Sequence, residues 1–132
     1  MCNVGDIIVI ENYTHNDIHL KKHSFVVLSD DAGQIQSIDY DLICNAMSSF
    51  KDETQKKKKL SFPGNFPIVP DDYEDIDGNN KSGYIKADQL YYFNKTNIQY
   101  IIIGSLKEDI FKLLFEFIEE ELEEFEKIIS NL

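Results

Sequence analysis

The chain has 132 residues, enough for one domain with a hydrophobic core and too few for two. It carries 24 acidic residues against 13 lysines and arginines, a formal net charge of -11, which excludes indiscriminate attraction to nucleic acid or anionic membranes. All 13 cations are lysines, so arginine is absent. Hydrophobic residues make up 42% of the chain, which excludes disorder as its main state. We therefore expect a single packed domain over 1–132 that meets any polyanion through a local basic patch.

Short β-branched and aromatic runs bounded by turn residues predict strands over the first hundred residues. Between residues 34 and 49 the pattern predicts one or two strands, with 42–48 as the central strand of the sheet. The stretches 11–22, 51–59 and 71–82 are polar and are predicted as loops. The other predicted strands are 7–10, 25–28, 68–69, 83–86, 90–93 and 98–103.

The period of the apolar residues changes at the C-terminal end. Ser105 with Glu108 three residues later has the pattern of a capping box, and apolar residues then recur at helical spacing. We predict a barrel over 1–104 and one long helix over 105–130, in a mainly β (α+β) fold. Phe111, Phe115 and Leu122 form a second apolar stripe, so a partner or a second subunit is expected to cover part of this helix.

The remaining global signals concern location. No stretch approaches the ~20 apolar residues of a membrane span, and the N-terminus lacks a secretory signal pattern. Cys2 and Cys44 have no metal-binding spacing and are expected to be reduced thiols, with Cys44 buried. We therefore expect a cytoplasmic protein that does not associate with membranes.

One local basic patch stands out against the acidic background. Residues 50–62 contain five lysines and two acids, a net of +3, with Phe50, Phe62 and Phe66 nearby. Lysine with aromatic residues is the combination that binds single-stranded nucleic acid, and a solvated loop is the alternative interpretation. The lysines are Lys51, Lys56, Lys57, Lys58 and Lys59.

Four short strings occur in order along the chain: 4–7 (Val-Gly-Asp-Ile), 24–30 (Ser-Phe-Val-Val-Leu-Ser-Asp), 46–48 (Ala-Met-Ser) and 88–90 (Asp-Gln-Leu). With the expected strand order and terminal helix, they resemble the MazF/PemK family of toxin endoribonucleases. The resemblance implies an SH3-like small β-barrel of the MazF/PemK/CcdB type. It also implies metal-independent, sequence-specific cleavage of single-stranded mRNA with no cofactor, a homodimer, and an antitoxin protein as partner.

The sequence departs from the family at two positions where arginine is usual, which here are His23 and Tyr91. The third functional position of the family is retained as Ser48. A site with His23 as acid or base, Ser24 and Ser48 on phosphate oxygens, and charge from Lys22 or Lys51 would suffice for RNA cleavage.

Structural roles for these residues remain an alternative. His23 is then a strand residue satisfied by a backbone partner, and the protein is a non-catalytic barrel that binds a protein partner through its acidic C-terminal helix. Strand alternation sends Tyr91 and Phe93 to one face and Tyr92 to the other, so at least one ring is expected in the core. Another ring is expected to face solvent, a partner or a base, and Tyr91 is our candidate for stacking on RNA.

Two segments of the sequence carry residue types that bind metals. His15, His19 and His23 are spaced four apart, but 11–22 does not have a helix-forming composition, so a loop is favoured over a zinc site. Under the resemblance, His15 and His19 are expected to assist substrate contact. The acidic run 71–78 does not fit the ligand register of a calcium loop. We predict no metal.

Overall fold

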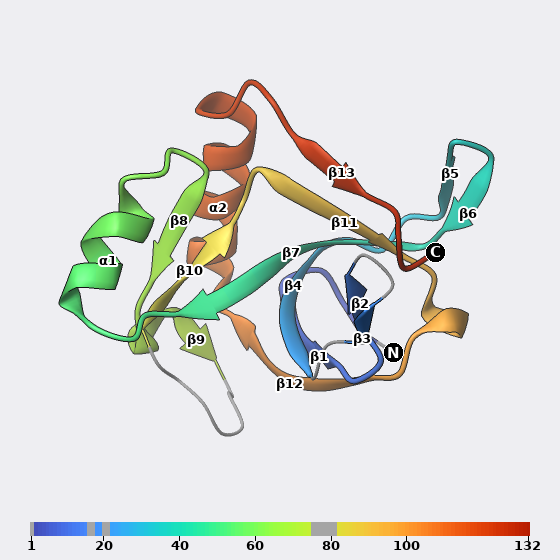
Figure 1. Cartoon of the computed structure of the whole chain (residues 1–132), viewed down its shortest axis with the longest axis horizontal. Helices are drawn as coiled ribbons and strands as arrows, with labels where there is room; N and C mark the ends of the chain where they lie inside the picture. Colours follow the sequence, from blue (N-terminus) through green and yellow to red (C-terminus); the bar gives the residue numbers. More distant parts are fainter. Residues whose placement is uncertain (1, 16–17, 20–21, 75–81) are drawn as a thin grey trace.

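The computed structural model describes residues 2–15, 18–19, 22–74 and 82–132. Its strands form a mainly β fold in which one sheet curls strongly upon itself (Figure 1). The main path of the sheet runs β13-β11-β7-β4-β1-β12-β9, and β10 joins β7 to β8. The strands of this sheet are β1 (Asp6–Ile10), β4 (His23–Ser29), β7 (Leu42–Ser49), β8 (Asn65–Ile68), β9 (Tyr73–Glu74), β10 (Gly83–Lys86), β11 (Gln89–Phe93), β12 (Tyr100–Leu106) and β13 (Glu126–Ile128).

The predicted strands are confirmed except at 68–69, where the strand is Asn65–Ile68, which pairs with β10, and Val69 lies outside it. The strand predicted over 98–103 begins at Tyr100. Residues 42–48 lie in the middle of the sheet as β7, between β11 and β4. Two small hairpins are added: β2 (Thr14–His15) with β3 (Ile18–His19), and β5 (Gly33–Ile35) with β6 (Ile38–Tyr40). The fold is thus a mainly β, curled sheet with a C-terminal helix, which is compatible with a small β-barrel. No described helix has the length and apolar character needed to span a membrane.

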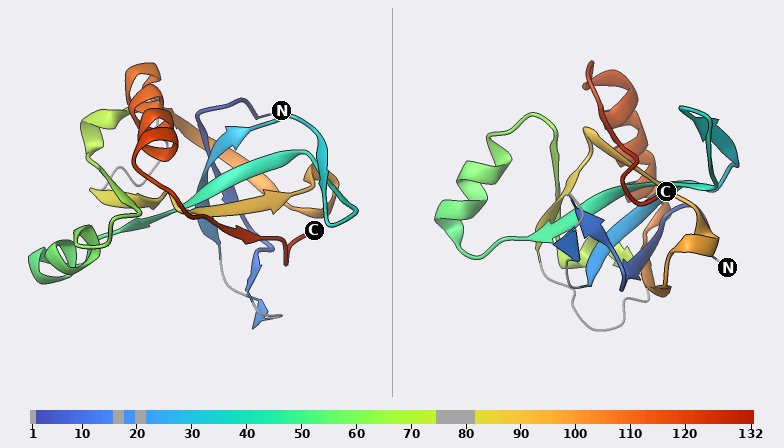
Figure 2. Two further views of the ribbon diagram at one scale, coloured as in Figure 1. Left: turned by 90° about the horizontal axis from the view of Figure 1, so that it is seen from above. Right: turned by 45° about the vertical axis from the view of Figure 1, so that its right-hand side comes forward.

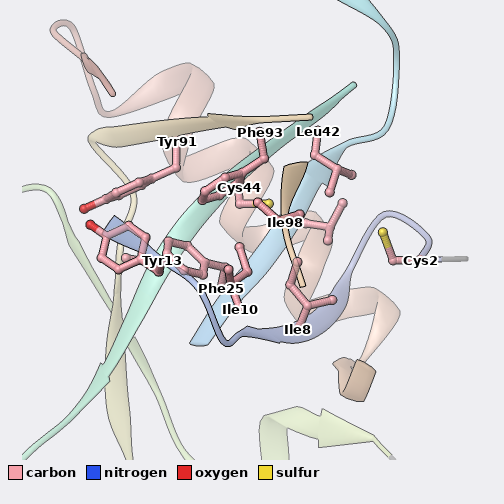
Figure 3. Packing of buried hydrophobic residues seen from close by; sticks show 12 residues of the cluster. Cys2, Ile8, Ile10, Tyr13, Phe25, Leu42, Cys44, Tyr91, Phe93 and Ile98 are labelled. Carbon is pink, nitrogen blue, oxygen red and sulfur yellow. The ribbon is translucent and has the colours of Figure 1, made fainter. Parts of the chain in front are cut away.

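Buried side chains form two clusters, one on each face of the sheet. The face that we call the aromatic face carries Cys2, Ile8, Ile10, Tyr13, Phe25, Val27, Leu42, Cys44, Ala46, Tyr91, Phe93 and Ile98 (Figure 3). The opposite face, which we call the helix face, carries Ile7, Val26, Leu28, Met47, Ile68, Ile85, Ala87 and Leu106, packed against Leu114 of α2 (Glu108–Glu120). Both cysteines are free, buried thiols, as expected for Cys44.

The prediction of one helix over 105–130 is wrong. Ser105 belongs to β12, where it pairs with Asp6, so no capping box forms, and α2 begins at Glu108 and ends at Glu120. The acidic run that follows opposes helix propagation, because like charges lie four residues apart and carboxylates at a helix C-terminus oppose its dipole. The chain instead turns back as β13 and lies parallel to β11, where Ile128 pairs with Tyr91 and packs against the aromatic cluster.

The prediction of a loop over 51–59 is also wrong, because residues Glu53–Leu60 form helix α1. Asp52 caps the helix by accepting a hydrogen bond from the Gln55 amide at 2.7 Å, and Lys51 donates its own amide to the Gln55 side chain at 2.6 Å. The residues between are good helix formers. The lysines of the last turn lie at the negative end of the helix dipole, and this attraction stabilises the helix further.

The other predicted loops contain short regular elements. Residues 11–22 include the β2–β3 hairpin, and 71–82 begins with a 3-10 turn (Pro70–Asp72) and β9, which pairs with β12. A second 3-10 turn, Lys95–Asn97, precedes β12.

In Figure 1, α1 lies beyond the end of β7, and the β5–β6 hairpin lies at the other end of that strand. Figure 2 shows α2 and α1 as separate projections from the sheet.

Candidate functional site

A hollow of about 390 Å³ opens where β4 begins and β7 ends. We call it the hollow. Apolar residues of the helix face form one part of its lining, and polar residues at the start of β4 and the end of β7 form the other. Four of the residues proposed from the sequence line it. The lining residues are Ile7, Lys22, His23, Ser24, Met47, Ser48, Ser49, Ile68, Tyr73 and Ile103.

Strand alternation divides the proposed catalytic residues between the two faces. Phe25 pairs with Ala46, and both belong to the aromatic cluster. His23 is two residues before Phe25 on β4, and Ser48 is two residues after Ala46 on β7, so their side chains share the aromatic face. Figure 3 shows how tightly rings pack on this face. His23 and Ser48 therefore lie on the same face, at the ends of adjacent strands, and both line the hollow.

Ser24 lies on the other face. It pairs with Val9, two residues along β1 from Ile7, and Ile7 belongs to the helix cluster. The same alternation directs Met47 and Ser49 to this side. Ser24 therefore does not share the face of His23 and Ser48, although all three residues line the hollow.

His23 is held in one orientation by its neighbours. Its ring lies 5.0 Å from the ring of Phe25 and 5.4 Å from that of Tyr13, measured between centroids. Its Nδ1 lies 3.1 Å from the backbone oxygen of Ser24. Since a carbonyl oxygen only accepts hydrogen bonds, Nδ1 carries the proton and the other ring nitrogen, Nε2, is the free base.

The surroundings also favour the neutral form of His23. Burial lowers the pKa of His23 below its usual 6.5; the bond to the Ser24 carbonyl opposes this effect, and the positive charge of Lys86 adds to it. Lys86 follows Ile85, which pairs with Met47 on the helix face, so Lys86 lies on the face of His23. No local sequence pattern marks Lys86, because only the pairing of β10 with β7 brings it to this site.

The lysines of α1 do not line the hollow, but the chain brings them close to it. Ser49 lies on its rim, and the N-cap of α1, Asp52, follows three residues later. No side chain of α1 is buried, so Lys56, Lys57, Lys58 and Lys59 face solvent wholly or in part. The end of α1 is fixed to β8, because the Asn65 side chain donates to the Lys59 carbonyl at 2.8 Å. Lys51 is exposed between strand and helix.

Tyr91 is a core residue and does not line the hollow. Only 5% of its surface is exposed, and its ring packs edge-on against Phe25 and Tyr13 at centroid distances of 5.1 and 5.9 Å. Burial raises the pKa of Tyr91, helped by a hydrogen bond with Tyr13 and by the negative charge of Glu126. Tyr92 and Phe93 are buried too, so the expectation that one of the three rings faces solvent is wrong. β13 covers the edge that would otherwise expose Tyr91.

Tyr73, Met47, Ser49 and Ile103 line the hollow without having been selected from the sequence. They come from three strands, and no local pattern links them. Among the residues that the structure describes, no three His, Cys, Asp or Glu side chains gather as a metal site would. The side chains of His15 and His19, and residues 75–78 of the acidic run, lie outside the described residues.

Comparison of the chain with protein-family models and with curated proteins finds no match.

Proposed function

We propose that the chain is a metal-independent endoribonuclease, resembling MazF/PemK toxins, that cleaves single-stranded mRNA at the open end of an SH3-like barrel. The observation that carries this proposal is that His23 and Ser48, at the ends of β4 and β7, line the same hollow. These are two of the three positions where the resembling family has functional residues. Their place on the same face of adjacent strands supports a shared role.

His23 supplies the base that the reaction needs. Its Nε2 takes the proton of the ribose 2′-hydroxyl, the 2′-oxygen attacks the adjacent phosphorus, and the 5′-oxygen leaves with a proton from water. The hydroxyl of Ser48 donates to a phosphate oxygen. Lys86, whose charge is felt at His23, stabilises the negative charge that grows on the phosphate. In this proposal Lys86 takes the place of the two arginines that the family uses.

The lysines near the hollow provide a track for the RNA backbone. Lys22 lines the hollow, and the exposed lysines of α1 extend the positive charge beyond the end of β7. Single strands are attracted to such a track through their phosphates, even though the whole chain is acidic. The proposal includes a cytoplasmic location, where mRNA is found.

Cleavage of a mixed-sequence RNA, in the presence of EDTA, tests this function. We expect fragments that end in 2′,3′-cyclic phosphate and 5′-hydroxyl groups. His23→Ala is expected to lower the rate by about 10² or more, the contribution of one general base. Ser48→Ala is expected to lower it less. A substrate with 2′-deoxyribose at the cleaved position is the matched control and is expected to remain intact.

Equal cleavage by the wild type, His23→Ala and Ser48→Ala would remove these residues from the mechanism. Loss of cleavage in EDTA that returns with Mg²⁺ would contradict the metal-independent part. Melting temperatures of the variants separate loss of chemistry from loss of fold.

A homodimer and an antitoxin protein belong to the same proposal. An interface with another chain is supported by exposed apolar side chains on β12, where Ile101 and Ile102 are 49% and 43% exposed. Exposed apolar side chains of this size favour an interface. Sedimentation of the purified chain at several concentrations tests the dimer, and a monomer at all of them would exclude it.

A second candidate function is a non-catalytic barrel that binds a protein partner through α2. The specific support is Leu113 and Phe115, which are 52% and 40% exposed on a helix whose other exposed residues are five acids and one lysine. Salt separates the two functions: RNA binding through lysines weakens steeply as salt rises, whereas apolar docking on α2 does not.

A further inference from the structure

Ser24, Ser49 and Tyr73 line the hollow with hydroxyl groups that have no side-chain hydrogen-bond partner among the described residues. Burial, with the nearby carboxylate of Asp72, raises the pKa of Tyr73 to about 12, so its phenol stays protonated and able to donate. The hydroxyls surround an apolar floor that includes Ile7 and Met47.

An apolar hollow with a few converging polar groups is the usual form of a site for a small organic group. Its volume of about 390 Å³ has room for a nucleobase. Tyr73 offers a ring for stacking, and Met47 offers a polarisable sulfur that packs well on aromatic rings. These features suit a flat ligand with apolar faces and a polar edge.

The polar groups of the lining also select among bases. Lys22 is a pure donor, the three hydroxyls donate or accept, and no Asp or Glu is among the lining residues. A carbonyl edge, as in uracil and guanine, is well served by donors. The exocyclic amino groups of adenine and cytosine need acceptors, for which the lining side chains offer hydroxyl oxygens and the His23 ring but no carboxylate.

Resting on the proposed function, we propose that the hollow binds one unstacked base of the RNA substrate and prefers the keto bases uracil and guanine. Strand alternation makes this possible. Ser24 presents to the base on the helix face while its neighbour His23 acts on the ribose on the aromatic face. The RNA then crosses the ends of β4 and β7, with one nucleotide turned into the hollow.

Binding of short fluorescent single-stranded oligonucleotides tests the proposal independently of cleavage. We expect all-uridine oligonucleotides to bind more tightly than all-cytidine ones, and inosine-containing ones more tightly than adenosine-containing ones. Each pair compares a carbonyl with an amino group. Tyr73→Leu is expected to weaken uridine binding about tenfold, the loss of one stacked base, whereas Tyr73→Phe keeps the stacking ring and is expected to weaken binding less.

Two further variants complete the test. Ser24→Ala combined with Ser49→Ala is expected to reduce the preference for uridine over cytidine. Tyr40→Phe and Tyr40→Leu, on the distant β5–β6 hairpin, are the matched controls and are expected to leave binding unchanged. Thermal melting establishes that each variant is folded.

The outcomes separate this proposal from the proposed function. Equal binding of uridine and cytidine, together with unchanged binding by folded Tyr73→Leu, overturns the base site even when RNA is cleaved. A keto preference that depends on Tyr73 supports the base site even when no cleavage is observed.

Discussion

His23 and Ser24 are neighbours in the chain, but β4 directs their side chains to opposite faces of the sheet. The His23 ring packs with Phe25 and Tyr13, whereas Ser24 pairs with Val9 on β1. Both residues line the hollow, so one strand end supplies it with an imidazole and a hydroxyl from opposite faces of the sheet. The predictions below test the two sides and the fold that holds them.

The titration of His23 follows from its burial. Because the fold lowers its pKa below 6.5, the unfolded chain takes up the proton first as pH falls. His23 therefore lowers the free energy of unfolding as pH drops through about 6.5, and its effect levels off below the folded pKa. We expect an NMR titration midpoint for His23 below 6.5. In His23→Gln this part of the pH dependence is absent. A midpoint above 6.5 would contradict the burial argument.

Lys86→Gln tests the charge beside His23. Removing the positive charge is expected to raise the pKa of His23, because that charge disfavours the imidazolium. The same variant is expected to slow RNA cleavage, since the phosphate loses its nearest proposed cation. Lys95→Gln, away from His23, is the control for both measurements. An unchanged NMR titration in Lys86→Gln would exclude electrostatic coupling between the two residues.

Replacing the four lysines of α1 (Lys56, Lys57, Lys58 and Lys59) by Gln tests the RNA track. We expect weaker RNA binding and a smaller salt dependence, by about 0.7 in the logarithmic slope for each lysine that contacts a phosphate. A matched control replaces Lys95, Lys107, Lys112 and Lys127 by Gln, which changes the net charge equally. Both variants can be measured by fluorescence anisotropy over a salt series. Equal effects of the two sets would assign the attraction to net charge rather than to α1.

Tyr91→Ala distinguishes a core residue from a base-stacking one. The ring is buried against Phe25, Phe93 and Tyr13, so its removal is expected to cost about 3–5 kcal/mol in the free energy of unfolding. Denaturant unfolding measures this cost. Lost RNA affinity at nearly unchanged stability would instead restore Tyr91 as a stacking residue.

Asn45→Asp tests how β7 holds the turn between β10 and β11. Asn45 is fully buried, and its side chain donates to the backbone oxygens of Ala87 and Gln89 at 3.4 and 2.8 Å. Aspartate has the same shape but would direct a carboxylate at two carbonyls. We expect a loss of about 3 kcal/mol or more, since a buried donor becomes an unpaired charge. Asn97→Asp, at an exposed position, is expected to have little effect in the same unfolding experiment.

The strands were predictable because each depends on a local pattern. Residues 7–10 and 25–28 are β-branched and aromatic runs closed by turn residues, and such runs form strands in most contexts. Helix α1 was predictable in principle, since Asp52 followed by Gln55 is a helix start, but the lysine run was interpreted as solvated loop. The helix after β12 was predicted too long, because its apolar period continues into residues that pack elsewhere.

The sequence alone therefore determined a mainly β fold, an acidic chain with one lysine-rich segment, and a short set of candidates that includes His23 and Ser48. Only the tertiary structure decided that these two share a face, that Ser24 does not, and that Lys86 and Tyr73 belong to the site. It also decided that Tyr91 is buried among Phe25, Tyr13 and Phe93, on a strand whose edge pairs with β13. The physical reason is that strand formation follows from neighbouring residues, whereas the pairing register joins segments far apart in the chain and sets which side chains meet.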